Sequence, residues 1–341
     1  MQITMKDKIL ARLSDAGDFV SGQQLCDEFG VSRTAVWKAV NRLKKEGYVI
    51  ESVTNRGYRL KAGSDVLSES EIRSYLKTDS IGRKLAVYTE CDSTNIRVSQ
   101  AAGEGAPEGM VAVADRQTAG KGRRGRSWQS PSGVSISMSI LLRPDIAPEV
   151  SPQITLVAAL AVSSAIDGLV NEDSGDGGQV ETRQQALIKW PNDIVMGDRK
   201  ICGILTELQC QTDYIDHIVV GIGINVSNTV FSPEIADMAG SIFSVTGKKV
   251  NRNKLVAAVC DYFEKYYNVF LQTQNLEKLV AEYDKKLINM ERQVRVLDPK
   301  GEYDGVAKGI TDEGRLVVET PEGVRYVSSG EVSVRGIYGY V

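Results

Sequence analysis

A glycine-rich basic stretch, Gln117–Trp128, offers the clearest chemistry in this 341-residue sequence. Its cations are interleaved with glycines: Lys121, Arg123, Arg124 and Arg126 with Gly120, Gly122 and Gly125. Glycines let a backbone approach a ligand closely and move, and the cations can gather the charge of a polyphosphate. The spacing is neither that of the G-x-x-x-x-G-K-[ST] phosphate loop nor that of a helix-opening dinucleotide fingerprint. Composition alone favours an RNA- or DNA-binding loop, but the flanking apolar strands and the motifs below favour a small anionic ligand.

Four further motifs place polar side chains beside apolar segments. They are Asp92-Ser-Thr-Asn95, Lys189-Trp-Pro-Asn-Asp193, Lys200-Ile-Cys-Gly-Ile-Leu-Thr-Glu207 and Gly221-Ile-Gly-Ile-Asn225. Each is weakly diagnostic alone, and Gly221–Asn225 by itself is typical of a strand end. Five such motifs in series are hard to obtain by accident.

Metal and disulfide chemistry is not indicated, and no metal site is assigned. The five cysteines form no C-x-x-C pair and are odd in number, which fits a reducing cytosol. The single histidine, His217, excludes a multi-histidine cluster and is interpreted as structural. No signal-peptide core opens the chain, and no apolar run approaches the roughly 18–20 residues of a membrane span. We therefore expect a cytoplasmic protein with no membrane partner.

Residues 66–289 alternate strand and helix patterns, which predicts a mixed α/β domain. Predicted strands cover 85–89, 110–114, 135–142, 187–189, 194–196, 203–209 and 218–225. Predicted helices cover 70–77, a segment from Asn95 to about Ala102, 155–169, 253–271 and 276–286. The stretch 171–185 has almost no apolar residue and is predicted to be a solvated surface loop without an assigned function.

Residues 1–62, the head, follow the element order of a winged helix-turn-helix. Predicted helices cover Lys6–Ala16, Gly22–Phe29 and Arg33–Glu46, with Ser21 and Ser32 as N-caps. Val36, Trp37, Val40 and Leu43 recur at helical spacing in the third helix. The strands Tyr48–Val53 and Tyr58–Leu60 form a hairpin with Arg56 at its tip.

The head is basic although the chain is acidic. Residues 1–62 hold 11 Lys+Arg and 7 Asp+Glu, a net +4, whereas the whole chain has 41 and 44, a net −3. The asymmetry favours a nucleic-acid partner for the head. The side chains that could reach phosphates or base edges are Ser32, Arg33, Thr34, Lys38, Asn41, Arg42 and Arg56. A small helical domain with solvated lysines is the less favoured alternative, because the turn, caps and wing occur in the right order.

Five short β-runs end the chain. They cover 293–297, 301–310, 315–320, 325–328 and 332–335, separated by Pro/Gly/Asp turns. We predict a small SH3-like β-barrel over 290–341, which from sequence alone could be an inert cap.

The five motifs, in this order, resemble those of biotin–protein ligases. With its winged head the chain is similar to the bifunctional members that also act as biotin operon repressors, and the resemblance extends over almost the whole chain. It implies an α+β multidomain protein whose central ligase domain is similar to class II aminoacyl-tRNA synthetases.

The resemblance also implies roles for individual residues. Ser93, Thr94 and Asn95 would hydrogen-bond the ureido ring of biotin, a task that short polar side chains suit. Further biotin contacts are implied for Gln117, Lys121, Gly122, Arg123 and Lys189, and ATP or adenylate contacts for Arg123, Arg124, Arg126, Trp128 and Asn225. Lys189 and Arg123 would be catalytic, with Lys189 beside the biotin carboxylate and the α-phosphate. Lys121 stands where an arginine is expected, which keeps the charge but loses the bidentate fork.

The implied reaction is a two-step acyl transfer that uses biotin and ATP with Mg²⁺. The biotin carboxylate attacks the α-phosphate to give biotinyl-5′-AMP, which a lysine of a biotin carboxyl carrier protein then attacks. No covalent enzyme nucleophile is needed, because positioning and charge stabilisation suffice. The adenylate would also favour a homodimer that binds operator DNA and represses transcription.

Two alternatives remain open. The first is a ligase whose head no longer regulates, and the second is a non-catalytic biotin-sensing repressor. The second is disfavoured because the loop cations and Lys189 are all present. Lipoate ligases share the general scaffold, but nothing here resembles their histidine-containing motif.

Overall fold

The computed structural model describes residues 5–16, 18–45, 48–61, 65–172, 185–211, 214–299, 301–329 and 333–336. The chain divides into two compact units, Met1–Val66 and Leu67–Val341, each with its own apolar core. The predicted solvated loop at 171–185 lies almost entirely outside the described residues.

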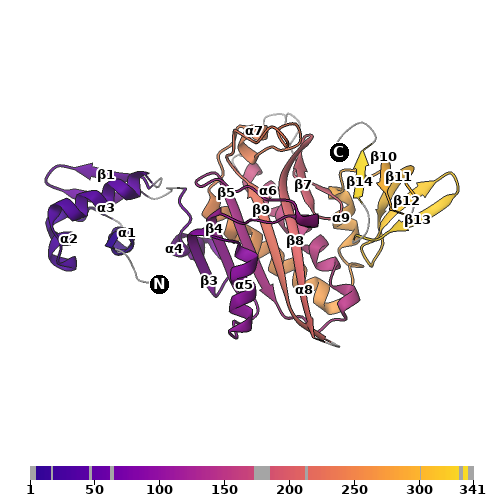
Figure 1. The fold of residues 1–341 in the computed structure, drawn as a ribbon, viewed down its shortest axis with the longest axis horizontal. Helices are drawn as coiled ribbons and strands as arrows, with labels where there is room; N and C mark the ends of the chain where they lie inside the picture. Colours follow the sequence, from indigo (N-terminus) through magenta and orange to yellow (C-terminus); the bar gives the residue numbers. More distant parts are fainter. Residues whose placement is uncertain are drawn as a thin grey trace. The chain divides into compact units, whose positions relative to one another are not determined.

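The first unit contains three helices and a hairpin in the predicted order (Figure 1). They are α1 (Met5–Ala16), α2 (Gly22–Phe29), α3 (Arg33–Lys45), β1 (Ile50–Val53) and β2 (Gly57–Leu60). The predicted N-cap Ser21 forms a capping box with Gln24, and α2 ends at Gly30, whose φ of 66° suits glycine. Ser32 Oγ accepts from Ala35 N at 3.2 Å, as expected for the cap of α3.

The buried face of α3 does not include Trp37. Val36, Val40 and Leu43 are at most 1% exposed, whereas Trp37 is 57% exposed. The grouping of Trp37 with the apolar face was therefore wrong. Successive helical residues are rotated by about 100°, so Trp37 points away from the face that Val36 defines.

The second unit is built on a seven-stranded sheet of order β3-β4-β5-β9-β8-β7-β6. Its strands are β3 (Leu85–Cys91), β4 (Val111–Gln117), β5 (Ser135–Leu142), β6 (Leu187–Lys189), β7 (Asp193–Met196), β8 (Arg199–Gln211) and β9 (Tyr214–Asn225). β3 pairs with β4 in parallel, and the other neighbours pair antiparallel. All seven strands were predicted, although β3, β4, β8 and β9 extend beyond their predicted ends.

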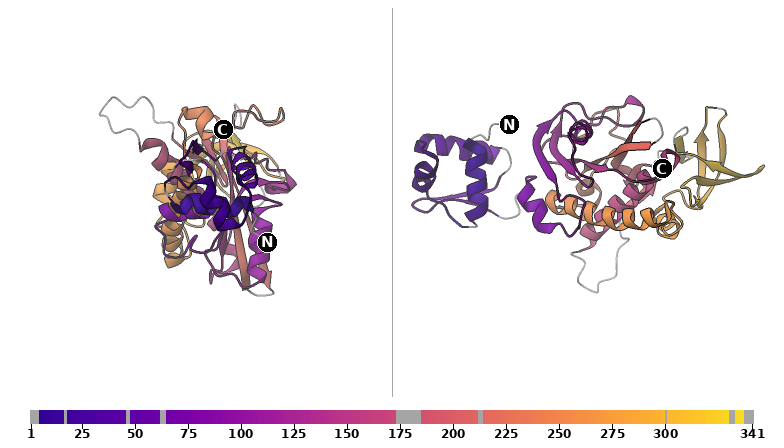
Figure 2. Two further views of the ribbon diagram at one scale, coloured as in Figure 1. Left: turned by 90° about the vertical axis from the view of Figure 1, so that its left-hand side faces the viewer. Right: turned by 90° about the horizontal axis from the view of Figure 1, so that it is seen from below.

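Helices cover both faces of this sheet, with α5 on one face and α6 and α8 on the other (Figures 1 and 2). The helices are α4 (Glu69–Tyr75), α5 (Thr94–Gly103), α6 (Gln153–Asn171), α7 (Ile242–Thr246), α8 (Arg252–Thr273) and α9 (Val280–Lys286). The short helix α7 was not predicted. Helix α9 begins later than the predicted 276, because Leu276–Leu279 forms a turn with Leu279 N donating to Leu276 O at 2.7 Å.

The alternation of residues along the strands explains the two faces. In β5, Ile136, Met138 and Ile140 enter the large core with α6 and α8. On the opposite face Leu141 joins a smaller core with Val98 and Ala102 of α5. Side chains two apart share a face of a strand, so Ser137 and Ser139 also face the side of α5.

The segment Pro148–Asn171, which includes α6, is long and apolar enough to cross a membrane, contrary to the expectation that no run approaches that length. However, 78% of its most apolar window is buried inside the unit, as in the core helix of a globular protein.

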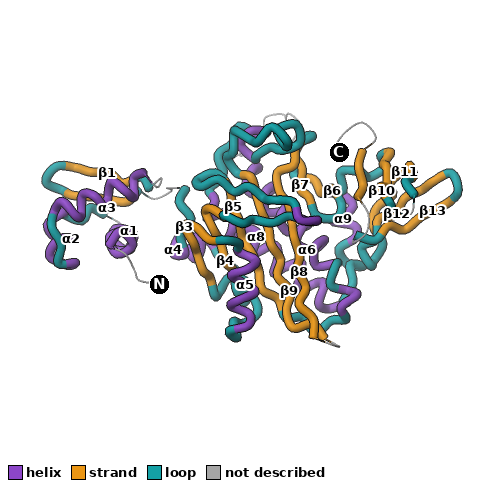
Figure 3. The backbone as a smooth tube through the Cα atoms, viewed as in Figure 1, coloured by secondary structure: helices purple, strands orange, loops and turns teal. Residues whose placement is uncertain are grey.

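The C-terminal part of this unit is an antiparallel five-stranded sheet of order β13-β12-β11-β10-β14 (Figure 3). Its strands are β10 (Gln293–Leu297), β11 (Tyr303–Ile310), β12 (Leu316–Thr320), β13 (Gly323–Val327) and β14 (Ser333–Gly336). Trp190 Nε1 donates to the Gly314 carbonyl at 3.1 Å, which ties this sheet to the central one.

Candidate functional site

A cavity of about 710 Å³ lies in the second unit, between the start of α5, the glycine-rich stretch and strands β8 and β9. The ligand-contact residues expected from the sequence all line it: Ser93, Thr94, Asn95, Gln117, Lys121, Gly122, Arg123, Arg124, Arg126, Trp128, Lys189 and Asn225. Residues up to 132 positions apart, from Ser93 to Asn225, thus meet in one place.

The floor of the cavity is made of small residues on the α5 face of the sheet. Gly221 and Gly223 of β9 lie opposite Leu205 and Gly203 of β8. A Cβ on Gly223 would lie 2.5 Å from Nε1 of Trp128, and one on Gly221 would lie 2.9 Å from Cγ of Asn95. The Gly-Ile-Gly-Ile-Asn motif therefore makes room for Trp128 and Asn95 while its isoleucines enter the core.

One end of the cavity, the amide end, is a polar network in which Thr94, Asn95 and Ser139 are buried, Gln117 is half-buried and Glu207 is exposed. Thr94 N donates to Gln117 Oε1 at 2.7 Å, and Asn95 Nδ2 donates to Glu207 Oε2 at 2.6 Å. The Ser139 hydroxyl lies 2.6 Å from both Thr94 Oγ1 and Asn95 Oδ1. These bonds fix the orientation of the Thr94, Asn95 and Gln117 side chains before a ligand arrives.

Ser93 belongs to the same end of the cavity. It is the N-cap of α5 and 5% exposed, yet its side chain makes no capping hydrogen bond. Its hydroxyl therefore remains available for a ligand in the cavity.

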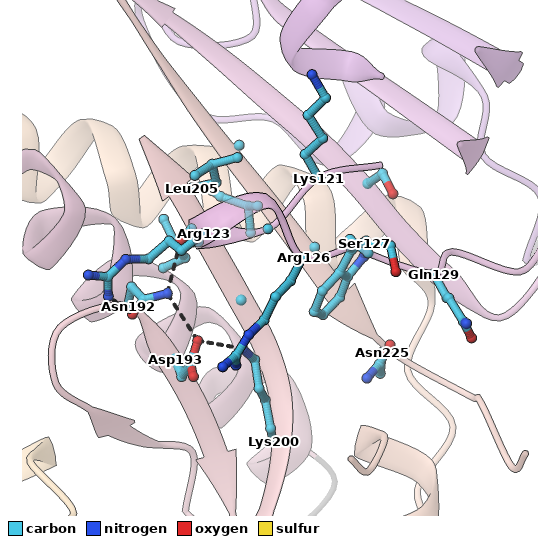
Figure 4. Close-up of a pocket in the computed structure, with 18 of the residues that line it drawn as sticks. Lys121, Arg123, Arg126, Ser127, Gln129, Asn192, Asp193, Lys200, Leu205 and Asn225 are labelled. Atoms are coloured by element: carbon cyan, nitrogen blue, oxygen red, sulfur yellow. Dashed lines mark hydrogen bonds and ion pairs between the residues drawn. The ribbon is translucent and has the colours of Figure 1, made fainter. Parts of the chain in front are cut away.

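The other end, the cationic end, carries a chain of charged and amide groups (Figure 4). Arg123 donates to Asn192 Oδ1 at 2.7 Å, and Asn192 Nδ2 donates to Asp193 Oδ1 at 3.1 Å. Lys200 Nζ lies 2.6 Å from the same carboxylate oxygen and 5.9 Å from the centre of the Trp128 ring. Arg126 points toward Asp193 and Lys200, whereas Lys121 points away from them (Figure 4). An anion at this end would meet several cations at once.

Two lysines of this end differ in accessibility. Lys189 is only 6% exposed, whereas the side chain of Lys200 is 28% exposed. Lys200 was quoted in a motif but given no role by sequence reasoning. The ammonium group of Lys200 can exchange Asp193 for an incoming anion without a rearrangement of the residues around it.

The glycine-rich stretch is held by backbone hydrogen bonds within it and, in its middle, by the side chain of Arg123. Trp128 N donates to Gly120 O at 2.9 Å, and Gly122 N donates to Arg126 O at 2.7 Å. Between them, Arg123–Gly125 forms a short 3₁₀ turn with left-handed φ angles at Arg124 and Gly125. The Trp128 indole N–H is buried without a hydrogen-bond partner in the described part of the chain. A ligand acceptor beside this N–H would satisfy it.

Arg123 also links this stretch to the C-terminal sheet. Its guanidinium donates to the Ser329 carbonyl at 2.7 Å, and Val334 of β14 lines the cavity. Burial lowers the pKa of Arg123 from its usual value, although the carboxylate of Asp193 acts in the opposite direction. The C-terminal sheet therefore forms part of the cavity wall.

Sequence reasoning missed several lining or supporting residues. The alternating serines of β5 indicated Ser139 only weakly, and the end of the Lys200–Glu207 motif indicated Glu207 only weakly. The segment that supplies Val230, Phe231 and Met238, and the carbonyl of Ser329, gave no signal in the sequence. His217, interpreted as structural, lies 3.2 Å from Ser99 Oγ and 2.5 Å from Asp216 Oδ2, outside the cavity lining.

The residues expected to contact nucleic acid lie in the first unit. Ser32, Arg33, Thr34, Lys38, Arg42 and Arg56 are exposed, and Asn41 is half-buried. Arg33 donates to Gln23 Oε1 at 2.8 Å, and the Arg56 guanidinium lies 4.4 Å from the centre of the Phe19 ring. Both contacts hold a cation in a defined place on the surface.

These features define a ligase-type catalytic unit joined to a helix-turn-helix head, and three family models match accordingly. Residues 89–225 match the biotin/lipoate A/B protein ligase family, residues 6–59 an HTH domain, and residues 290–335 the biotin protein ligase C-terminal domain.

Whole-chain relatives specify the family further. The bifunctional ligase/repressor BirA of Bacillus subtilis (strain 168) is 38% identical over 337 residues, which cover 98% of this chain and 100% of that protein. The BirA of Escherichia coli (strain K12) is 29% identical over 97% of this chain and 98% of its own length. The chain belongs to the family of bifunctional ligase/repressors.

A solved structure agrees with this assignment. Biotin protein ligase from Aquifex aeolicus in complex with biotin and ATP superposes with a TM-score of 0.61 and 28% identity, covering 74% of this chain and 99% of that chain.

Proposed function

We propose that this protein activates biotin with ATP to biotinyl-5′-AMP, transfers biotin to a lysine of a biotin carboxyl carrier protein, and represses transcription while it holds the adenylate. The observation that carries the proposal is the meeting of all expected ligand-contact residues in one cavity of about 710 Å³. That volume lies within the roughly 300–1,000 Å³ typical of ligand pockets.

The amide end would bind the ureido ring of biotin. Ser93, Thr94 and Gln117 offer donors and acceptors at fixed positions, which suits a small ring with a fixed pattern of its own. Asn95 is already bonded to Glu207 and lies beside Ser139, so it would shape the site as much as contact the ring.

The cationic end would hold the biotin carboxylate and the α-phosphate. We keep Lys189 and Arg123 as catalytic groups and add Lys200, because its partly exposed ammonium group can meet an anion entering the cavity. Two anions that repel each other need shared cations between them, and preorganised charges stabilise the charge that develops during the reaction. Gly122 and Lys121 would border the biotin chain.

The nucleotide would lie along Trp128, Asn225, Arg124 and Arg126. Mg²⁺ would enter with ATP and would neutralise part of the negative charge of the phosphates. The described residues contain no group of three or more His, Cys, Asp or Glu side chains that could hold a metal. Asp193, the carboxylate beside Lys200 in the cavity lining, would be the protein group that holds the ion.

The reaction needs two displacements. A biotin carboxylate oxygen attacks the α-phosphorus, and the bond to pyrophosphate breaks. The neutral amine of the carrier lysine then attacks the acyl carbon, AMP leaves, and the new amide loses its extra proton. The glycine-rich stretch would cover the mixed anhydride and exclude water between the steps.

The head would bind operator DNA through Ser32, Arg33, Thr34, Lys38, Asn41, Arg42 and Arg56. We propose that the adenylate favours a homodimer. A homodimer can place two heads on one operator, which raises the avidity for DNA by roughly 10²–10⁴. We further propose a cytoplasmic location. We propose three domains, at 1–62, 66–289 and 290–341. The central domain would be similar to class II aminoacyl-tRNA synthetases, and the C-terminal strands would have an SH3-like arrangement.

The test incubates the full chain with biotin, MgATP and a biotin-acceptor domain and follows the mass of the acceptor. We expect one biotin to be added to one acceptor lysine, with ATP consumed. A chain lacking residues 1–62 should ligate equally well and lose DNA binding. An unmodified acceptor would overturn the ligase assignment, and identical DNA binding by both chains would overturn the role of the head.

A further inference from the structure

An exposed tryptophan interrupts the polar surface of α3. Trp37 is 57% exposed, although tryptophan is usually largely buried. The core of the first unit closes without it, since Ile9, Leu25, Val36, Val40 and Leu43 are at most 1% exposed. Single exposed apolar side chains are common on protein surfaces, so the position of this one decides its meaning.

Trp37 lies in a row of side chains on the outer face of α3. Arg33 is four residues before it, Asn41 four residues after it and Lys44 three residues further, and residues three or four apart share a helix face. The flanking cations are held in place from both sides. Arg33 donates to Gln23 of α2 at 2.8 Å, and Lys44 Nζ donates to Ser52 Oγ of β1 at 2.8 Å. The indole is therefore presented between two cations held by neighbouring elements.

The charge around the indole indicates which kind of partner can bind against it. Helix α3 carries five cations (Arg33, Lys38, Arg42, Lys44 and Lys45) and no carboxylate. A second copy of this positive surface would be repelled. A DNA duplex offers phosphates to the cations and, in the major groove, thymine methyl groups and sugar edges to an apolar side chain.

We propose that Trp37 contacts DNA directly, packing its indole against sugar or thymine-methyl groups in the major groove between the phosphates that Arg33 and Lys44 approach. The inference rests on the proposed DNA binding of the head and adds to it an uncharged contact. Such a contact releases no counterions, so it contributes affinity that does not depend on salt.

The experiment uses the full chain with biotin and MgATP, and a duplex selected from a randomised library by the wild-type protein. Affinity is measured over a range of salt concentrations for Trp37→Ala, Lys38→Ala and Val49→Ala. Val49 is the matched control, because it is 51% exposed in the same unit but lies outside α3. Thermal unfolding and ligation activity should be unchanged in all three variants.

We expect Trp37→Ala to weaken binding by about ten-fold at every salt concentration, with the same slope of log Kd against log salt as the wild type. Lys38→Ala should flatten that slope by about 1 per head, and Val49→Ala should behave as the wild type. Tryptophan fluorescence should change when the duplex is added, and Trp37→Phe should lose that change.

Several outcomes would overturn the inference. Wild-type affinity in Trp37→Ala would show that the indole does not touch DNA. A flattened salt slope in that variant would show that Trp37 acts only by positioning cations. A change in self-association without a change in DNA affinity would assign the indole to a second copy of the chain. If the wild-type chain selects no duplex, the proposed function of the head fails and the inference fails with it.

Discussion

The two ends of the cavity are built on opposite principles. At the amide end, Thr94 and Asn95 are at most 8% exposed and are bonded to strands β4, β5 and β8. At the cationic end, Arg124 and Arg126 are exposed on a stretch whose middle is held to the rest of the unit by the Arg123 side chain. The first end is fixed before binding, whereas the second can adjust.

This difference matches what each end would recognise in the proposed function. A small ring with fixed donors and acceptors is discriminated by groups that cannot rearrange, because an analogue then leaves buried polar atoms unpaired. A reacting pair of anions changes shape and charge along the reaction, so a mobile cover with several cations serves better.

The largest effect is expected from removing either of the two lysines of the cationic end. Lys200→Ala should lower ATP–pyrophosphate exchange by about 10²–10³-fold, and Lys189→Ala by a similar amount, because each strands a carboxylate and a phosphate without their shared cation. Lys278→Ala, at an exposed lysine outside the cavity lining, should exchange at the wild-type rate. If Lys189→Ala keeps full ATP–pyrophosphate exchange and Lys200→Ala loses it, then Lys200 and not Lys189 is the catalytic lysine.

An intermediate effect is expected from replacing one glycine by alanine at each end of the cavity in separate variants. In Gly221→Ala the new Cβ would overlap the Asn95 amide, so Asn95 must leave Ser139 and Glu207, and the KM for biotin should rise roughly 100-fold. In Gly122→Ala the nearest atom lies 3.6 Å away and φ is −113°, so the KM should change less than about two-fold. Steady-state kinetics at varied biotin gives both values, and thermal unfolding checks that Gly221→Ala folds. Equal effects would mean that the two ends are equally rigid.

The smallest effect is expected from Arg123→Gly. The variant loses the bonds to Asn192 and to the Ser329 carbonyl, so the cover should open more easily and biotinyl-5′-AMP should dissociate about ten-fold faster. Activated biotin should then reach lysines of unrelated proteins in the mixture, which mass spectrometry detects. Lys121→Gly removes a cation of the same stretch that points away from Arg123 and should retain the adenylate better. Retention as tight as in the wild type would show that Arg123 does not hold the cover.

Much of the fold was predictable because local signals agreed with the tertiary structure. The Ser21 and Ser32 caps fixed two helix starts in the head, and the alternation in β5 gave that strand its observed bounds. The extensions of β8 to Arg199 and of β9 to Tyr214 were missed, because polar residues interrupt the apolar pattern there, although the ladder continues and Ile201, Cys202 and Ile215 are buried. Helix α7 has five residues, too few to show a helical period.

The residue types of the site were predictable, but their partnerships were not. Asn95 and Glu207 are 112 positions apart, and Arg123 and Ser329 are 206 apart, so only the topology brings them together. The exposure of Trp37 was missed for a related reason. Spacing shows which residues could share a face, but Val36, Val40 and Leu43 already filled the core.

Two hydrogen bonds join the C-terminal sheet to the rest of the unit, one from Arg123 to the Ser329 carbonyl and one from Trp190 to the Gly314 carbonyl. They affect which segments of such proteins can be exchanged between relatives by recombination. Both acceptors are main-chain atoms, so the position of the backbone matters more than most of the side chains beside it. Gly314 is an exception, because its φ is 76° and a Cβ there would lie 2.9 Å from Leu156. Other substitutions beside these acceptors should be inherited more freely than insertions and deletions, which should be purged or compensated in the glycine-rich stretch. A chimera that exchanges the last 50 or so residues with a distant relative would inherit a mismatched cavity wall. The join between the two compact units, at Val66 and Leu67, is the better crossover point for modular exchange.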